Sequence, residues 1–312
     1  MDDRRRRLIG AGVLGRGGAT FARTISPTWG SELLSDPGLE GIYTAGLCAG
    51  FSKGGSPTVS QSADVHGGAK AQEFTAVANS NGIHYGSLAS VVGFEKISAW
   101  SKRTAGASGK TNIQHITTFG TIKQIFSITW ADYTQIELVA RNNGASDLYP
   151  CINRDASVFD TVIVDDISHK KLTLSTALAT PKTHDSDAIV RAGVTVPVCY
   201  QGGVAMNLNS LSTPTYGVLA YVDGNPLGTV GTYAATLDQI INNVWTRLVH
   251  AVITYVAGAS IEVRNVGNTY QLWYNGAQIG ADQTISDATI RAGTIATQFA
   301  TSPNVIFASY AP

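Results

Sequence analysis

The sequence predicts an all-β protein with two tandem β-sandwich (jelly-roll) domains and an extended N-terminal arm. Segments rich in Val, Ile, Thr and Tyr are short, as in VIVDDIS (162–168) and WTRLVHAVITYV (245–256), and Gly, Asn, Asp and Ser separate them. Helical patterns are scarce. Hydrophobic residues make up 44% of the chain and charged residues only 14%, so the surface depends on neutral polar side chains. Many short strands of this kind are typical of sandwiches and jelly rolls.

The arm, residues 1–23, is basic and rich in glycine. It holds six arginines against two aspartates, and the rest of the chain is acidic, so the formal net charge is zero. GAGVLG (10–15) matches G-x-G-x-x-G, but no strand precedes it, so we reject a dinucleotide site. LIGAGVLG is too poor in bulky apolar residues for a secretory signal. The acidic body argues against nucleic acid as the main ligand.

We therefore interpret the arm as a segment that a partner orders, because it has too little apolar surface to fold alone. Arginine pairs well with carboxylates. The residues expected to bind the partner are Arg4, Arg5, Arg6, Arg7 and Arg16.

The first domain, residues 24–170, contains four segments in a suggestive order: LLSDPGLEG (33–41), SQSADVHGGAKAQEFTA (60–76), EKISAWSKRTAGASG (95–109) and VIVDDIS (162–168). Together they resemble the family 4/9/22-type carbohydrate-binding modules. The resemblance implies a jelly roll in which a structural calcium joins the first and last strands.

By position, the resemblance makes Glu40, Asp165 and Asp166 the calcium ligands, and hard carboxylate oxygens suit that ion. The alternative is that the two aspartates are turn residues or solvated charges. Such modules stack sugars on exposed aromatic rings. Trp100, Trp130 and Tyr133 are available, although aromatic residues in such patterns more often belong to the core.

The boundary between this domain and the second domain, residues 171–312, falls within a polar stretch that contains Pro181, residues 169–186. Asn275-Gly276 predicts a tight hairpin turn between two strands. The order of SDAIVRAGVTV (186–196), YGVLAYVDG (216–224) and the 261–280 hairpin resembles laminin-G-like, concanavalin-type sandwiches. These bind glycans or proteins, or act as spacers. A sugar would contact Trp273, Tyr274 and Asn275.

Two local patterns leave alternatives open. DAIVRAG (187–193) recurs as DATIRAG (287–293), which we interpret as two strands of one sandwich, with coincidence as the alternative. ATLDQIINNVW (235–245) fits a short helix or a loop followed by the start of a strand.

The sequence shows no catalytic signature. It lacks GxSxG, HExxH and clustered carboxylates, and residues 171–312 hold one glutamate, Glu262. The three cysteines, Cys48, Cys151 and Cys199, fit buried thiols, or a Cys48–Cys151 bridge with one thiol left over. No run of eighteen apolar residues predicts a membrane span.

The tandem of a carbohydrate-module-like jelly roll and a laminin-G-like sandwich resembles bacteriophage virion proteins. It implies a non-enzymatic decoration, tail or baseplate protein on the particle surface, hence extracellular. We expect its arm to bind other capsid or tail proteins and the chain to form a homo-oligomer. The alternative is a glycan-binding adhesin or receptor-binding module. No cofactor other than calcium is implied.

Overall fold

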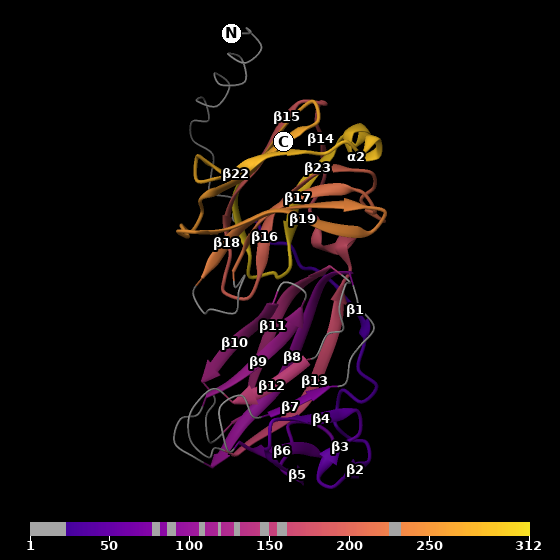
Figure 1. Cartoon of the computed structure of the whole chain (residues 1–312), viewed down its shortest axis with the longest axis vertical. Coiled ribbons are helices and arrows are strands. Elements are labelled where there is room, and N and C mark those ends of the chain that lie inside the picture. Colours follow the sequence, from indigo (N-terminus) through magenta and orange to yellow (C-terminus); the bar gives the residue numbers. More distant parts are fainter. Residues whose placement is uncertain are drawn as a thin grey trace.

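The computed structural model describes residues 23–76, 82–85, 92–105, 110–117, 120–127, 132–143, 150–154, 161–224 and 232–312. Only the backbone is described in β9, β10 and β12. Strands dominate these residues and form two stacked β-sandwiches (Figure 1), which confirms the all-β prediction. The arm arginines at positions 4–7 and 16 lie outside the described residues.

The first sandwich packs a six-stranded sheet, β11-β8-β13-β6-β5 with β1 beside β13, against a five-stranded sheet, β10-β9-β12-β7-β4. A small hairpin, β2-β3, lies beside them. The strands are β1 (Trp29–Glu32), β2 (Tyr43–Thr44), β3 (Leu47–Cys48), β4 (Phe51–Gly54), β5 (Thr58–Ser62), β6 (Ala71–Thr75), β7 (Gly82–Tyr85), β8 (Val92–Ala105), β9 (Lys110–Thr117), β10 (Gly120–Ser127), β11 (Thr134–Asn143), β12 (Pro150–Arg154) and β13 (Thr161–Leu172).

The second sandwich packs the sheet β14-β23-β16-β17-β18-β19 against the sheet β22-β21-β20-β15-β24. Its strands are β14 (Lys182–Thr183), β15 (Ala188–Thr195), β16 (Gln201–Leu208), β17 (Gly217–Asp223), β18 (Tyr233–Ile241), β19 (Val244–Ile253), β20 (Ser260–Val266), β21 (Thr269–Tyr274), β22 (Ala277–Thr284), β23 (Ile295–Ala300) and β24 (Ile306–Ala311). A 3-10 turn, η1 (Leu174–Ala177), precedes them, and a short helix, α2 (Ala288–Ala292), precedes β23.

Local chemistry explains several of these elements. The Asn275-Gly276 turn is confirmed: both residues have positive φ, 48° and 81°, and join β21 to β22. The 235–245 stretch is not helical, because it contributes to β18 and β19 around a turn at Asn242-Asn243.

The interpretation of the DAIVRAG repeat as two strands is wrong. Residues 188–195 form β15, but residues 288–292 form α2. The aspartates that begin the two repeats make different contacts. Asp287 accepts a hydrogen bond from the Ile290 backbone N–H and caps the helix, whereas Asp187 accepts from the distant Gly267 N–H. Pairing with β20 and β24 then keeps β15 extended.

The segment before β1 belongs structurally to the second sandwich. Arg23 exchanges two backbone hydrogen bonds with Phe307 of β24, and Ile25, 6% exposed, lies in the core of the second sandwich. The sequence had assigned residues 24–170 to the first domain. The chain thus contacts the second sandwich, crosses to build the first, and returns.

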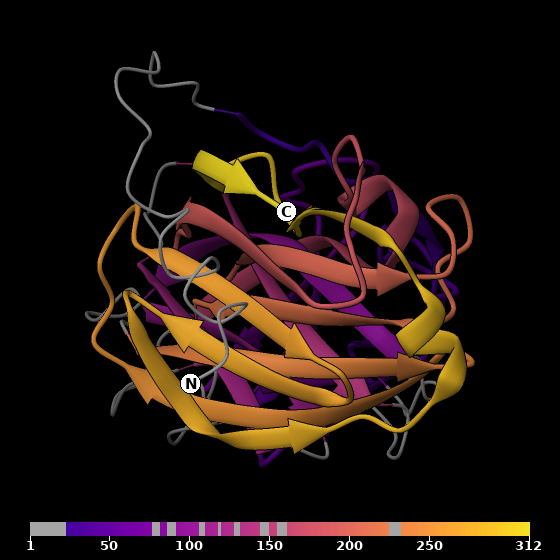
Figure 2. The same cartoon turned by 90° about the horizontal axis from the view of Figure 1, so that it is seen from above.

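An apolar cluster joins the two sandwiches, and the second covers the end of the first when seen from above (Figure 2). The Phe94 ring of β8 lies 5.2–5.5 Å from the rings of Phe299, Tyr221 and Trp245. Because these rings come from both domains, their burial opposes separation of the sandwiches.

A buried ion pair lies within the same interface between the two sandwiches, which we call the joint. Arg141 of β11 is 1% exposed and donates through Nε to Oδ2 of Asp238 in β18, 3.0 Å away. The Tyr221 hydroxyl donates to the same oxygen at 2.8 Å. Arg247 lies 3.8 Å from the other carboxylate oxygen. Arg141 and Asp238 come from different domains, so this buried pair forms only while the domains are docked.

Cys48 and Cys199 are both buried, and Cys48 forms no disulfide, so the predicted Cys48–Cys151 bridge is wrong. The Cys48 thiol donates to Asp36, and burial, together with Asp36, raises its pKa to about 11. Among the described residues no helix is long and apolar enough to cross a membrane.

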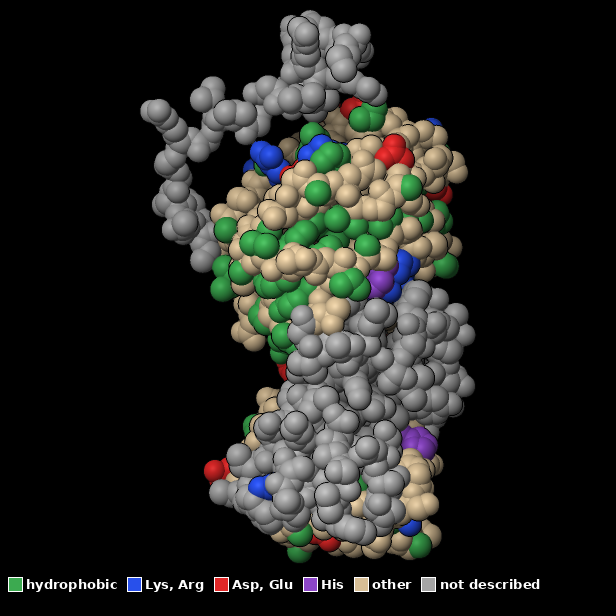
Figure 3. Space-filling model, turned by 60° about the vertical axis from the view of Figure 1, so that its left-hand side comes forward, with side chains coloured by type: hydrophobic (Ala, Val, Ile, Leu, Met, Phe, Trp, Pro, Cys, Tyr) green, Lys and Arg blue, Asp and Glu red, His purple; other side chains and the backbone are tan. Residues whose placement is uncertain are grey.

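The surface of the second sandwich carries a band of hydrophobic side chains (Figure 3). Exposed valines in this domain include Val244 and Val252 of the edge strand β19. Homo-oligomerisation stays a prediction.

Candidate functional site

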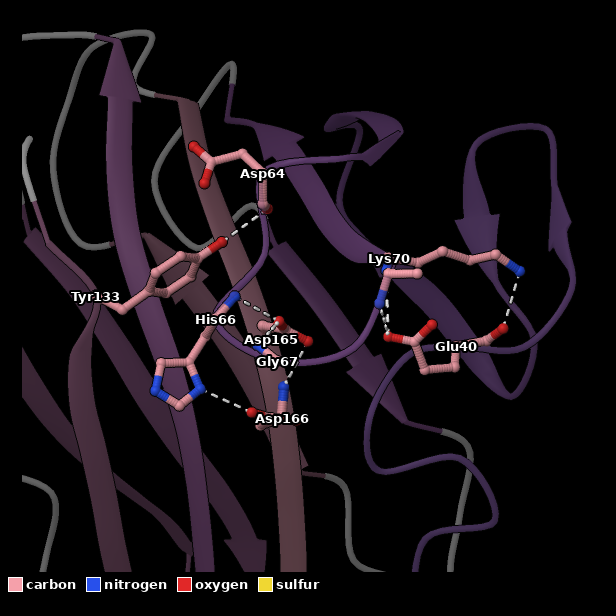
Figure 4. Close-up of polar contacts among 9 residues, drawn as sticks. Glu40, Asp64, His66, Gly67, Lys70, Tyr133, Asp165 and Asp166 are labelled. Carbon is pink, nitrogen blue, oxygen red and sulfur yellow. Dashed lines mark hydrogen bonds and ion pairs between the residues drawn. The ribbon is translucent and has the colours of Figure 1, made fainter.

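The predicted calcium ligands lie around one loop of the first sandwich, residues 63–70, which precedes β6 (Figure 4). Asp165 and Asp166 lie in β13 where its register with β8 shifts. Asp166 has a positive φ of 47°, which accompanies this irregularity. Glu40 approaches the loop from the segment that follows β1.

Asp165 hydrogen-bonds to the middle of the loop, at His66 and Gly67. Its side chain is fully buried, and Oδ2 accepts hydrogen bonds from the backbone N–H groups of His66 and Gly67 at 2.8 and 3.0 Å. Oδ1 accepts from the Asp166 N–H at 2.8 Å. Burial raises the pKa of Asp165, and these three N–H donors oppose that rise. The carboxylate thus fixes the backbone that carries His66.

Glu40 hydrogen-bonds to the C-terminal end of the loop, at Ala69 and Lys70. Its Oε1 accepts from the N–H groups of Ala69 and Lys70 at 2.8 and 3.1 Å, and Lys70 Nζ donates back to the Glu40 carbonyl at 2.9 Å. Gly68 has a φ of +66°, and a Cβ there would lie 1.9 Å from Glu40 Oε1. A glycine is therefore required for this contact.

The loop that Asp165 and Glu40 hold places the His66 side chain against aromatic rings. Its imidazole stacks on the Trp100 indole with centroids 3.9 Å apart and planes 11° from parallel. The Tyr133 ring meets it edge-on at 5.6 Å. Nδ1 of His66 lies 2.8 Å from Asp166 Oδ2, and their side chains are 33% and 39% exposed. The imidazole is thus held on two sides and reaches the surface.

Charged groups surround these rings. The Tyr133 hydroxyl donates to the Asp64 carbonyl at 2.8 Å, and Lys102 pairs with the Asp64 carboxylate. Lys102 Nζ also lies 4.9 Å from the centre of the Tyr133 ring. Burial and Asp64 raise the pKa of Tyr133, which keeps its hydroxyl a donor. We call this cluster the His66 site: Asp64, His66, Trp100, Lys102, Tyr133 and Asp166.

The predicted calcium ligands Glu40, Asp165 and Asp166 make hydrogen bonds to the loop backbone and to His66. Among the described residues no group of three or more His, Cys, Asp or Glu side chains could hold a metal ion. Both oxygens of Asp165 already accept N–H groups, as does one oxygen of Glu40. These carboxylates therefore hold the loop backbone. Calcium stays a prediction from the resemblance.

The His66–Asp166 pair alone does not make a nucleophilic centre. In a catalytic triad the histidine contacts a nucleophile on the side opposite its carboxylate. Within the described part of the chain, the hydrogen-bond partner of the His66 ring is Asp166. No described serine, threonine or cysteine donates to this imidazole.

The second predicted sugar site, Trp273, Tyr274 and Asn275, does not lie on one face of β21, because successive side chains of a strand point to opposite faces. Tyr274 points inward, is 5% exposed and exchanges hydrogen bonds with the Val256 backbone. Trp273 lies on the outer face, where the Arg264 guanidinium sits 3.6 Å from the centre of its ring. Asn275 occupies the exposed turn. The three residues therefore do not share a surface, and Arg264 occupies one face of the indole.

Sequence reasoning found Trp100 and Tyr133 but missed their partners. His66, Asp64 and Lys102 lie within two of the segments that carry the resemblance. The available signal was the His-Gly-Gly triplet, because two glycines after a histidine allow a close approach to acidic side chains. Trp130 lies outside the described residues.

Comparisons with solved structures find sugar-binding β-sandwiches. The tandem CBM22-1–CBM22-2 domains of Xyn10C from Paenibacillus barcinonensis are similar over 92% of this chain and 97% of theirs, at 12% identity and a TM-score of 0.36. The CBM22-1 xylan-binding domain of the same protein covers 48% of this chain and 97% of its own length, at 18% identity and a TM-score of 0.37.

TmCBM61, solved with β-1,4-galactotriose, is similar over 45% of this chain and 98% of its own length, at 16% identity and a TM-score of 0.34. No protein-family model matches the chain, and no curated protein matches it in sequence. Identities and TM-scores this low are insufficient to transfer a ligand to this chain.

Proposed function

We propose that this chain is a non-catalytic glycan-binding protein and that the His66 site contacts the sugar. The observation that carries the proposal is the surface pair of His66 stacked on Trp100, with Tyr133 beside it and carboxylates at its edge. The proposal follows the adhesin alternative of the sequence analysis.

The chemistry of the site suits a sugar ring. One face of a pyranose carries C–H groups that pack against aromatic rings, and its rim carries hydroxyls that donate to carboxylates. Asp64 and Asp166 provide acceptors, and Lys102 provides a donor, next to three rings. A single site thus offers both kinds of contact.

The site is also organised before any ligand arrives. Asp165 and Glu40 hold the loop backbone in its middle and at its C-terminal end, so His66 does not need to be ordered on binding. A preformed site loses less conformational entropy when it binds.

We assign no catalytic step to this site. Glycoside hydrolysis needs an acid and a base or nucleophile facing one bond. Here Asp165 is committed to three backbone N–H groups and Asp64 to Lys102, which leaves Asp166 bound to His66.

A glycan array probed with the full chain tests the proposal, and titration calorimetry with any glycan that binds measures affinity. We expect Trp100→Ala to abolish binding and Trp100→Phe to retain part of it. Trp273→Ala is the matched control, because it removes an indole in β21 of the second sandwich and leaves the His66 site intact. Binding lost in Trp273→Ala but kept in Trp100→Ala would refute the assignment to the His66 site. An array without hits would refute the function.

The virion role rests on the arm, and residues 1–22 lie outside the described residues. It stays a prediction from the sequence, together with a location on a particle surface. Removing residues 2–22 and measuring incorporation into particles tests it.

A further inference from the structure

A cleft of about 810 Å³ lies in the joint between the sandwiches, remote from the His66 site. Three segments line it: residues 92–94 at the start of β8, residues 171–175 from the end of β13 into η1, and residues 212–215 of the second domain. Trp100 lies seven residues along β8 from Gly93, about 23 Å away. The cleft is within the usual size range of small-ligand sites.

The walls of the cleft are fixed by hydrogen bonds. The Asn209 side chain accepts from the N–H groups of Thr215 and Tyr216, both at 3.0 Å, and donates to the Thr215 hydroxyl at 2.9 Å. The Asn243 N–H donates to the Thr215 carbonyl at 3.0 Å. On the opposite wall, Thr173 and Thr176 hydrogen-bond to Thr28. The cleft is therefore preformed.

An indole edge forms part of the floor. Trp245 is 7% exposed and is held by the Phe94 ring at 5.5 Å and 90°, and by Arg141 at 5.8 Å. Gly93 has a φ of +117°, and a Cβ there would sit 3.8–4.0 Å from Lys171 Cε and the Trp245 ring. Because Gly93 has no side chain, the part of the cleft between the aliphatic chain of Lys171 and the Trp245 indole stays open.

The rim is made of hydroxyls and one cation. Ser175, Ser212, Thr213 and Thr215 contribute hydroxyl groups. Among the described lining residues Lys171 alone is charged, so no carboxylate there opposes an anion. Lys171 is exposed. The combination of apolar floor, hydroxyl rim and one ammonium group favours a polyhydroxylated ligand with a carboxylate that can pair with Lys171.

We propose that this cleft binds a short uronic-acid oligosaccharide, with one carboxylate on Lys171 and a C–H face against the Trp245 edge. The choice of a sugar rests on the proposed glycan-binding function. The place and the charge requirement are separate from the His66 site.

Titration calorimetry of the full chain with trigalacturonic acid and with its methyl ester tests the proposal. The ester keeps the size and hydroxyls and lacks the charge. We expect the acid to bind more tightly, and Lys171→Met to weaken acid binding about fivefold while leaving ester binding unchanged.

Two further variants bear on the site. Lys170→Met is the matched control, because Lys170 precedes Lys171 in β13 and its side chain points to the other face of the strand. It should leave both affinities unchanged. Ser175→Trp should fill the cleft and abolish binding of both probes.

No binding of trigalacturonic acid, or equal acid preference in wild type and Lys171→Met, would overturn the inference. The two failures are distinguishable. Array hits that Trp100→Ala abolishes, with no response to trigalacturonic acid, would sustain the function and remove the cleft proposal. Acid binding that persists in Trp100→Ala and disappears in Ser175→Trp, with array hits that also persist in Trp100→Ala, would support the cleft and argue against a sugar at the His66 site.

Discussion

Replacing Asp238 by asparagine tests the joint between the two sandwiches. Asp238 is fully buried in β18 and accepts from Arg141 of β11 at 3.0 Å and from the Tyr221 hydroxyl at 2.8 Å. The asparagine keeps the size of the side chain but removes its charge. The Arg141 guanidinium, 1% exposed, then stays buried beside a neutral amide.

The magnitude follows from the burial. Breaking a buried pair by neutralising one partner costs about 3–5 kcal/mol, because the remaining charge has lost its water. Arg247, 3.8 Å from the second carboxylate oxygen, adds to the uncompensated positive charge. We therefore expect Asp238→Asn to lower the free energy of unfolding by about 3 kcal/mol or more.

Urea unfolding followed by circular dichroism measures this change. Asp282→Asn is the matched control, since Asp282 is an exposed aspartate whose contacts are surface glutamines, and we expect a change below about 0.5 kcal/mol. The double variant Arg141→Met with Asp238→Leu should recover part of the loss, because the Arg141 charge is removed together with its partner while Arg247 keeps its charge.

A loss below about 1 kcal/mol in Asp238→Asn would refute the reasoning. So would a double variant as unstable as the sum of its two single variants. Either result would mean that the pair does not couple the sandwiches.

Three further predictions concern other parts of the chain. Burial, Arg247 and Arg141 lower the pKa of His250 to about 4, from 6.5 when unfolded, so protons bind the unfolded chain preferentially between these values. The free energy of unfolding should fall by about 1–2 kcal/mol as the pH drops from about 6.5 to about 4, and His250→Gln should remove that part of a urea-measured pH profile; an unchanged profile would contradict the assignment. If Glu40, Asp165 and Asp166 bind calcium, a chelator should lower the melting temperature measured by calorimetry and added calcium should restore it, whereas unchanged melting would contradict the calcium prediction. Ile25→Ala should cost about 2–4 kcal/mol in urea unfolding, since Ile25 lies in the core of the second sandwich, and a loss below about 0.5 kcal/mol would contradict that placement.

Most strands followed from local pattern. Alternation in residues 260–266 and the Asn275-Gly276 turn depend on the two-residue period of a strand and on positive φ, both of which neighbouring residues determine. Local sequence does not decide the structure of the two seven-residue repeats, 187–193 and 287–293, because nearly the same residues contribute to strand β15 in one and to helix α2 in the other.

The candidate site was predictable in part. Resemblance in residues 60–76 and 95–109 pointed to the part of the first sandwich that holds the His66 site, and it included Trp100. It could not show that His66 would lie on that indole, because their contact depends on the Asp165 carboxylate about a hundred residues away.

The sequence by itself determined the all-β class, the hairpin turn and the absence of local catalytic motifs, because strand alternation and turn chemistry are properties of adjacent residues. Tertiary structure alone decided the stacked His66–Trp100 pair, the return of residues 23–25 to the second sandwich, and the buried Arg141–Asp238 joint. Each of these joins groups far apart in the chain. Their energies come from burial and from pairing charges away from water, which local pattern does not encode.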